Sequence, residues 1–295
     1  MLKRIRHMEK PDLILNIIIL LGAVLNLFPL YWLITSSFKT SAAIYKMPPD
    51  WFPTTFNIGN YRDLFVGQPA FRWAFNSILV STVSTVLVIV FSSLAAYSFS
   101  KLQFKGKNAL YMVFICSLML PKEIFIVPLF KIVQALEWSD TYMGMIAPTV
   151  ASCFGVFLLK GFFDTVPDSI RESGKIDGAS ELTFFFKILL PVCTPVIAVL
   201  TLWQFVAMWN SYFDAMIYLN DSAKQPLQLV LRSILIQNQP ESGMIADMQS
   251  TAARAQLAEL LKYATIIISS LPLLIMYPFF QKYFDSGIMA GAVKG

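Results

Sequence analysis

The residues that could carry out chemistry in this chain are few, and their spacing argues against an active site. The only histidine is His7, in a basic amino-terminal tail, so histidine acid–base catalysis in the body of the chain is excluded. The carboxylates Glu123, Asp177 and Asp214 are not paired at catalytic spacing. The cysteines lie within apolar runs without metal-ligand spacing, which predicts core thiols and no metal site: Cys116, Cys153 and Cys193. An enzyme that uses these groups is therefore disfavoured.

The phosphate-cradling sequence G-x-x-x-x-G-K-[ST] does not occur in the chain. Two Gly-Lys pairs, Gly106-Lys107 and Gly174-Lys175, lack the upstream glycine that such a loop needs. Because this loop has few substitutes, we expect the chain to bind no nucleotide cofactor of its own. Any ATP that drives its function, with its Mg²⁺, must be bound and hydrolysed by a partner.

One stretch near residue 210 combines aromatic and amide side chains. It holds Gln204, Trp209, Asn210 and Asp214 within an apolar run. Aromatic rings stack on the C–H patches of sugars and amides hydrogen-bond to hydroxyls, so these residues, together with Asn76, are candidates for lining a pathway for a sugar. Hydrogen bonding between membrane spans and an interfacial tryptophan explain the same residues without a ligand.

Lys122 and Glu123 directly follow Pro121 inside another apolar run. At the centre of a membrane span each charge costs roughly 2.5–3.5 kcal/mol on insertion scales, unless it faces water or a partner. Two interpretations stay open. Either the proline breaks the helix and turns both groups toward a translocation path, or the span begins deeper and both charges lie at the outer interface.

The composition predicts the elements that position these residues. The chain of 295 residues is 56% hydrophobic and 14% charged, with a mean hydropathy of +0.62. A polytopic, all-α membrane protein is expected at these values and a soluble globular domain is not. The net charge of +5 is concentrated in short segments between apolar runs, so it indicates topology in a lipid bilayer and not nucleic-acid binding.

Six apolar runs predict six spans in a single transmembrane domain that covers residues 1–295. The first run follows a basic tail as a signal peptide would, but its length of about 20 residues is enough to span a bilayer. The positive-inside bias then places both termini in the cytoplasm, a loop at 166–187 inside, and longer loops at 38–72 and 219–256 outside. The predicted spans are 13–34, 73–100, 111–133, 142–163, 188–213 and 260–280.

The loop at 166–187 is the most charged run between two long apolar segments. Pro167 suits a first helical position. The positive end of the helix dipole stabilises acidic residues in the early turns. Gly178 fits a left-handed helix end, and Ser180 can cap a second helix that re-enters the membrane. The small residues Ser173 and Gly174 predict a first helix that presses close against another protein.

The spacing E-x5-G-x9-I-x-L-P, formed by Glu172, Gly178, Ile188, Leu190 and Pro191, resembles the cytoplasmic coupling loop, or EAA loop, of ABC importer permeases. Further runs resemble the sugar-type branch of that family, from SFKT and PPDWFP near the amino terminus to the NS and WN pairs and the terminal AGAVKG. The two alanines of the family motif are Ser173 and Gly174 here. Both remain small, although a glycine inside a helix costs on the order of 1 kcal/mol relative to alanine.

The resemblance implies a permease of the smaller, maltose-type kind in a bacterial cytoplasmic membrane. Its implied partners are a second related permease, two ATPase subunits, and an extracytoplasmic solute-binding protein that delivers a sugar or an oligosaccharide of the aldouronate type. Glu172 would then be the acidic residue that docks on the ATPase, Gly178 the turn and Ile188–Pro191 the re-entry into the membrane, with Asp177 among the coupling residues. The tail, consisting of Ala292, Val293, Lys294 and Gly295, would reach the ATPase as well. Alternatives are an ABC permease for a non-sugar solute, a passive channel and a membrane-embedded enzyme.

Overall fold

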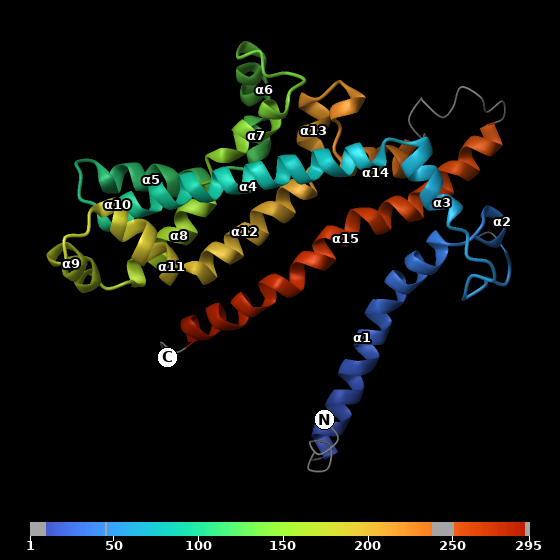
Figure 1. Cartoon of the computed structure of the whole chain (residues 1–295), viewed down its shortest axis with the longest axis horizontal. Helices are drawn as coiled ribbons and strands as arrows, with labels where there is room; N and C mark the ends of the chain where they lie inside the picture. The colour runs from blue at the N-terminus through green and yellow to red at the C-terminus, as the bar shows by residue number, and fades with distance from the viewer. Residues whose placement is uncertain (1–9, 45, 238–250, 293–295) are drawn as a thin grey trace. The chain divides into compact units, whose positions relative to one another are not determined.

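The computed structural model describes residues 10–44, 46–237 and 251–292, and this part of the chain is helical with no strand (Figure 1). The all-α prediction is therefore confirmed. The chain divides into two compact units, one of residues 1–69 and 233–270 and the other of residues 70–232 and 271–295. Helices α14 (Leu227–Gln237) and α15 (Thr251–Ala292) each have residues in both units.

The first unit contains α1 (Lys10–Ser37), the short helices α2 (Ser41–Ile44) and α3 (Gly59–Arg62), and a π-helix at Asp63–Gly67. The segment after α1 folds back onto the end of that helix. The Nδ2 of Asn60 donates to the carbonyls of Ser37 at 2.8 Å and Lys39 at 2.9 Å. Lys39 is itself buried, with its Nζ 4.0 Å from the centre of the Trp32 ring. The chain is thus tied down where it leaves α1.

The second unit is organised around α4 (Ala70–Lys101), which packs against α7, α8 and α12 (Figure 1). Serines on α4 allow close approach. A Cβ on Gly155 of α8 would lie only 2.6 Å from Ser92 Oγ, and the hydroxyls of Ser84 and Thr149 are 2.6 Å apart. The other helices of this unit are α5 (Lys107–Leu118), α6 (Ile126–Ala135), α7 (Tyr142–Val150), α8 (Cys153–Thr165), α9 (Asp168–Ile176), α10 (Glu181–Phe184), α11 (Leu190–Val192), α12 (Thr194–Trp209) and α13 (Phe213–Tyr218).

Among the described residues, four helical segments are long and apolar enough to cross a membrane without a sharp bend. They are Ile14–Ser37, Ala70–Lys101, Tyr142–Thr165 and Leu260–Gln281. They correspond to the predicted first, second, fourth and sixth spans. The described residues form up to six membrane spans if each of two bent helix pairs is one span.

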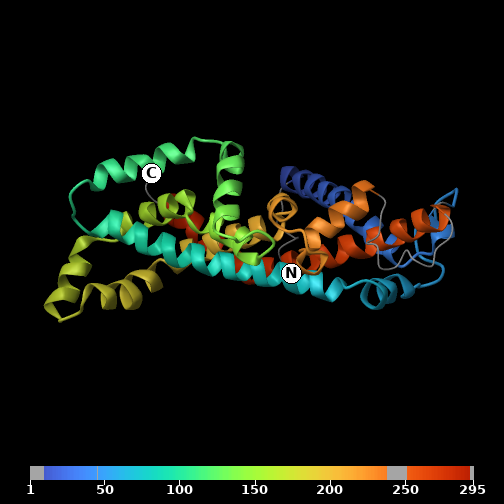
Figure 2. The ribbon, with the colours of Figure 1, turned by 90° about the horizontal axis from the view of Figure 1, so that it is seen from above.

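The predicted third and fifth spans differ from straight helices. In the third, α5 and the segment Lys122–Ala135, which begins with a 3-10 turn at Lys122–Phe125, meet at 100° around Pro121 (Figure 2). In the fifth, Glu181–Val192 and Thr194–Trp209 meet at 79°. There Pro195 has no N–H to donate to the carbonyl of Pro191, which instead accepts a hydrogen bond from Thr194 Oγ1 at 2.7 Å.

The fifth predicted span, 188–213, therefore contains two interruptions, because α12 ends at Trp209 and α13 begins only at Phe213. The predicted external loop 219–256 is also more regular than expected. It includes a 3-10 turn at Ser222–Lys224 and α14, while residues 238–250 lie outside the described part of the chain.

Candidate functional site

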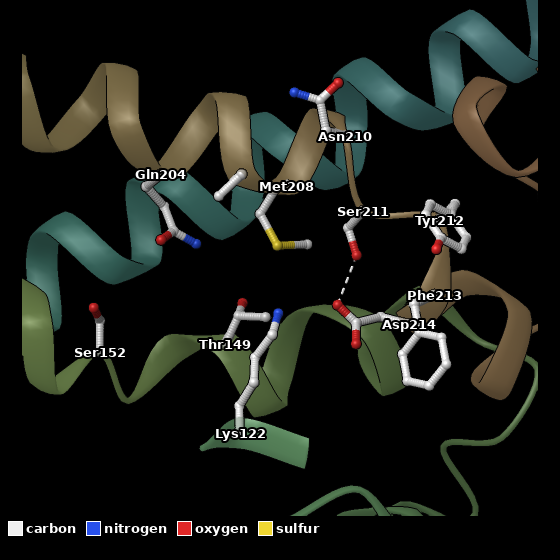
Figure 3. A pocket seen from close by; sticks show the side chains of 11 residues that line it. Lys122, Thr149, Ser152, Gln204, Met208, Asn210, Ser211, Tyr212, Phe213 and Asp214 are labelled. Atoms are coloured by element: carbon white, nitrogen blue, oxygen red, sulfur yellow. Dashed lines mark hydrogen bonds between the residues drawn. The ribbon is translucent and has the colours of Figure 1, made fainter. Parts of the chain in front are cut away.

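A polar cavity of about 370 Å³ lies in the second unit, where three helical runs are interrupted (Figure 3). One wall comes from the end of α12 and the start of α13. The opposite wall comes from the break between α7 and α8 and from the 3-10 turn after Pro121. The lining residues are Lys122, Thr149, Ser152, Gln204, Ala207, Met208, Asn210, Ser211, Tyr212, Phe213 and Asp214. Helix breaks thus collect hydroxyl, amide and charged groups within apolar surroundings.

Two charged side chains line this cavity. The amino group of Lys122 points toward Thr149 and the centre of the cavity (Figure 3). Asp214 Oδ2 accepts a hydrogen bond from Ser211 Oγ at 2.6 Å. No ion pair joins Lys122 to a carboxylate of the described residues. Opposite charges that remain separate leave hydrogen-bonding capacity for a polar ligand.

The amides of the cavity are held by neighbouring helices. Gln204 Nε2 lies 3.5 Å from Ser84 Oγ on α4, which is a weak contact. Asn210 Nδ2 donates to the carbonyl of Val206 at 3.0 Å, and its Oδ1 lies 3.4 Å from Gln228 Nε2 on α14. Neither amide is fully occupied by these bonds, so both can hydrogen-bond to a hydroxyl-rich ligand.

Lys122 also lines a second hollow of about 230 Å³, which shares Thr149, Phe213 and Asp214 with the first. Glu123 lines only this second hollow, beside aliphatic side chains such as Ile126. The break at Pro121 therefore places both charged residues, whose side chains are exposed, along the walls of hollows. This position is compatible with both interpretations, a translocation path and the outer interface.

Asn76 and Trp209, which were candidates for the pathway, do not line the cavity. Asn76 is buried, donates to the carbonyls of Ala223 and Gln225 at 3.0 Å each, and accepts from the Tyr142 hydroxyl at 2.7 Å. Trp209 is buried and its ring stacks on Phe205 with a centroid distance of 6.0 Å. Asn76 therefore joins α4 to α7 and to the segment before α14, as the alternative interpretation expects, whereas the stacking of Trp209 on Phe205 lies within α12.

The sequence interpretation missed several lining residues, namely Thr149, Ser152, Ser211 and Tyr212. A local signal existed for one of them. Ser152 caps α8 by accepting a hydrogen bond from the Gly155 N–H at 3.0 Å. Serine is a favoured helix cap, so a serine shortly after Pro148 indicates that a new helix begins within this apolar run.

The second candidate element is the predicted coupling segment, residues 166–187, in which α9 ends in a Schellman motif. Gly178 has φ +81°, its N–H donates to the Lys175 carbonyl at 3.0 Å, and the Ala179 N–H donates to the Gly174 carbonyl at 2.8 Å. Ser180 then caps α10 by accepting from the Thr183 N–H at 3.2 Å. The helix–glycine turn–helix arrangement is present as expected, except that Pro167 is the N-cap and Asp168 the first helical residue.

The structure separates the predicted ATPase-coupling residues into an outer and an inner set. Glu172, Ser173, Asp177, Gly178 and Pro191 are exposed. Gly174 is buried instead, and a Cβ there would lie 3.7 Å from Phe184 and 3.8 Å from Ile188. The Cα of Gly174 therefore faces α10 and the π-helix at Phe185–Leu189 of this chain, and not another protein as predicted. Leu190, like Ile188, is partly buried against the same apolar cluster.

A charged network that was not predicted as such holds the coupling segment together. Glu181 Oε1 accepts from Arg171 Nη2 at 2.6 Å and lies 2.9 Å from Lys175 Nζ, while its Oε2 accepts from Arg171 Nε at 3.2 Å and from the Tyr97 hydroxyl. The hydrogen bond to Glu181 raises the pKa of Arg171 above its ordinary value. Three elements, α9, α10 and α4, therefore meet at one carboxylate.

Lys101, the last residue of α4, fixes the beginning of α9. Its Nζ donates to the Val166 carbonyl at 2.6 Å and to Asp168 Oδ1 at 2.9 Å. This hydrogen bond and the charge of Lys101 hold the pKa of Asp168 below its ordinary value. Beneath these polar contacts lies an apolar cluster that includes Phe163, Phe184 and Leu189.

Three features define a multi-pass membrane transport protein. They are apolar helices long enough to cross a membrane, a polar cavity among these helices, and a charged helical segment at the end of α4. The family model described as "Binding-protein-dependent transport system inner membrane component" matches residues 88–290. The chain belongs to this family. It is a membrane permease subunit of a binding-protein-dependent ABC importer, and thus a transport component and not an enzyme, as predicted.

Curated relatives cover nearly the whole chain. The polygalacturonan/rhamnogalacturonan transport system permease protein YtcP of Bacillus subtilis (strain 168) is 35% identical over 285 residues, which are 96% of this chain and 98% of the relative. The arabinooligosaccharides transport system permease protein AraQ of the same organism is 30% identical over 284 residues, or 95% of each chain. A chain of a bacterial ABC transporter involved in the import of alginate shares the fold, with a TM-score of 0.81 at 24% identity over 94% of this chain and 99% of that chain.

Proposed function

We propose that this chain forms half of the translocation pathway for a sugar or an oligosaccharide, with both termini in the cytoplasm. A second related permease supplies the other half, and an extracytoplasmic binding protein delivers the substrate. The observation that carries this proposal is the polar cavity, in which Gln204, Asn210 and Asp214 offer hydrogen-bonding groups at the interruptions of apolar helices. Hydroxyl-rich solutes need such groups, and the relatives named for oligosaccharide transport support the same substrate class.

In this proposal the coupling segment docks on an ATPase subunit that binds ATP and Mg²⁺. Its outer surface combines the exposed carboxylates of Glu172 and Asp177 with exposed apolar side chains, since Ile176 is 86% and Leu182 65% exposed. Exposed apolar groups on a charged segment are expected at a protein-binding surface. The tail residues 292–295 would contribute to the same contact. Ala292 is the last residue of α15, while Val293, Lys294 and Gly295 lie outside the described residues.

The test uses the chain co-expressed with its partner subunits and reconstituted in vesicles with the binding protein. A panel of radiolabelled neutral and acidic oligosaccharides is offered, together with a non-sugar solute, and ATP-dependent uptake is measured. We expect uptake of an oligosaccharide, and a loss of uptake in Gln204→Leu and Asp214→Asn with the ATPase still bound. Uptake of the non-sugar solute alone would contradict the carbohydrate assignment.

Docking is tested separately by co-purification of the ATPase. Glu172→Lys reverses a charge on the exposed face of α9 and should reduce the amount of ATPase that co-purifies. Glu137→Lys is the matched control, because Glu137 is an exposed carboxylate in the connection between α6 and α7, outside the coupling segment. An equal amount of ATPase with wild type and Glu172→Lys would contradict docking through this face.

A further inference from the structure

The covalent route from the coupling segment to the cavity is poorly suited to carry a movement. From α9 the chain passes through the left-handed turn at Gly178, a π-helix at Phe185–Leu189 and a bend of 79° before α12. A π-helix and a bend each interrupt the regular backbone ladder that makes a helix stiff. A displacement of α9 would therefore be taken up at these joints before it reached α12.

A direct route runs instead through Glu181 into α4. The carboxylate binds Arg171 through both oxygens, at 2.6 Å and 3.2 Å, and such a fork-to-fork pair fixes orientation as well as distance. The Tyr97 hydroxyl of α4 donates to the same carboxylate. Lys175, one turn after Arg171 on α9, lies 2.9 Å from Glu181 Oε1. Glu181 thus joins the last turns of α9 to α4, while the Lys101–Asp168 contact joins only the first turn of α9 to the end of α4.

Helix α4 continues without interruption from this network to the cavity. Tyr97 lies 13 residues after Ser84 in the same helix, which is about 20 Å at 1.5 Å per residue. Ser84 Oγ is 2.6 Å from the hydroxyl of Thr149 and 3.5 Å from Gln204 Nε2, and both of these residues line the cavity. One rigid element therefore contacts the coupling segment at its end and the cavity wall near its middle.

We propose that Glu181 is the positioning residue that transmits movement of α9 to α4, and through α4 to the cavity, with Arg171 and Tyr97 as its two partners. This inference rests on the proposed function, since it requires an ATPase that moves α9. It assigns the transmission to a three-residue joint, whereas the exposed residues of α9 only bind the ATPase. A purely structural role of the same network would affect folding and assembly but not the ratio of transport to ATP hydrolysis.

The decisive variant is Tyr97→Phe in the complete reconstituted complex. It removes the hydroxyl that joins α4 to Glu181 and leaves the Arg171–Glu181 pair inside the coupling segment intact. We expect ATP hydrolysis and bound ATPase near wild-type levels, while the number of substrate molecules transported per ATP falls about tenfold, as expected from the loss of one hydrogen bond to a charged group.

Asp164→Asn is the matched control. Asp164 accepts from Ser100 Oγ of α4 at 2.7 Å and pairs with Lys160 at 2.6 Å, so it joins α4 to α8 and not to α9. The inference is overturned if Tyr97→Phe keeps the wild-type ratio, if it loses the ATPase on purification, or if Asp164→Asn lowers the ratio equally. A wild-type chain that binds no ATPase would refute the proposed function itself, and that result is visible before any variant is compared.

Discussion

At the residue scale, Gly178 sets the direction in which the chain leaves α9. Its φ of +81° lies in the left-handed region, and a Cβ would meet no atom within 4 Å, so the cost of Gly178→Ala is backbone strain alone, roughly 1–2 kcal/mol. We expect Gly178→Ala to lower stability by about this amount and to reduce ATP-driven transport, because the turn places Glu181 against Arg171. The measurements are thermal unfolding of the purified complex and uptake into vesicles.

The control for Gly178 is another glycine with the same constraint. Gly106, between α4 and α5, has φ +84° and also no atom within 4 Å of a Cβ. Gly106→Ala should lower stability similarly and leave the transport-to-ATP ratio unchanged. A similar loss of coupling in both variants would show that backbone strain anywhere in the chain has this effect.

Substitution of alanine for glycine is expected to change stability in opposite directions at two further positions. At Gly174 a Cβ would make ordinary contacts at 3.7–3.9 Å in a helix interior, so Gly174→Ala should stabilise the protein by up to about 1 kcal/mol through helix propensity. At Gly155 a Cβ would lie 2.6 Å from Ser92 Oγ and 3.1 Å from Ser92 Cβ, so Gly155→Ala should destabilise it by about 1–3 kcal/mol through overpacking. Chemical unfolding of both variants gives the signs, and equal signs would contradict this packing of α8 on α4.

Local residue patterns predicted the coupling segment well because its signals are local. A proline before a helix, a glycine at its end and a serine cap each act within a few residues, and all three occupy the expected turn, with Pro167 displaced by one position. The Glu181 network could not be predicted in the same way, since Tyr97 lies 84 residues earlier in the chain. Likewise, nothing local distinguishes the buried Trp209 from a residue that lines a pathway.

At the scale of elements, Asp140 joins the connection between α6 and α7 to the segment before α14. Its Oδ1 accepts from the backbone N–H groups of Asn220 at 3.0 Å and Asp221 at 2.9 Å, and Lys224 Nζ lies 3.1 Å from its Oδ2. The hydrogen bonds from Asp221 and Asn220, followed by that from Lys224, hold the pKa of Asp140 below its ordinary value of 3.8. The carboxylate form therefore stabilises this connection.

The sign of the resulting pH dependence follows from the lowered pKa. The contribution of Asp140 to stability is fully present above its ordinary pKa and is lost as the pH falls through the lowered value in the folded protein. We expect Asp140→Asn to lower the Tm at neutral pH, and the difference from wild type to vanish at a pH below both values. Glu137→Gln is the control, since Glu137 has a left-handed backbone as well, with φ +56° against +55° for Asp140. A pH-independent difference would contradict this role.

Among the elements, the sequence predicted where apolar runs occur but not their angles. Pro121 indicated an interruption of the third run, yet the bend of 100° depends on how Lys122–Ala135 packs, which composition does not encode. In the fifth run, the prolines at 191 and 195 lie one helical turn apart, and their combined effect moves the start of the apolar helix to Thr194. Hydropathy averages over such breaks, so it predicts the extent of an apolar run and not the angle within it.

At the scale of the whole molecule, one face of α12 indicates where the second permease would bind. A hollow of about 380 Å³ on this face is lined by Val199, Leu202, Trp203, Val206, Ala207 and Asn210. Ala207 and Asn210 also line the polar cavity, so the two hollows adjoin along α12. A partner seated on this face would close the cavity from that side, and Trp203, which is 63% exposed, would lie within the contact.

We therefore expect Trp203→Ala to weaken binding of the second permease by roughly 2 kcal/mol or more, as for a buried aromatic anchor at an interface. The measurement is the fraction of the second permease that co-purifies in detergent as the complex is diluted. Val86→Ala is the control, because Val86 on α4 is 53% exposed and lines neither hollow. If Trp203 faces lipid instead, truncation leaves the co-purified fraction unchanged, since lipid contact contributes nothing to subunit association. The polar cavity would then have to be closed from another side.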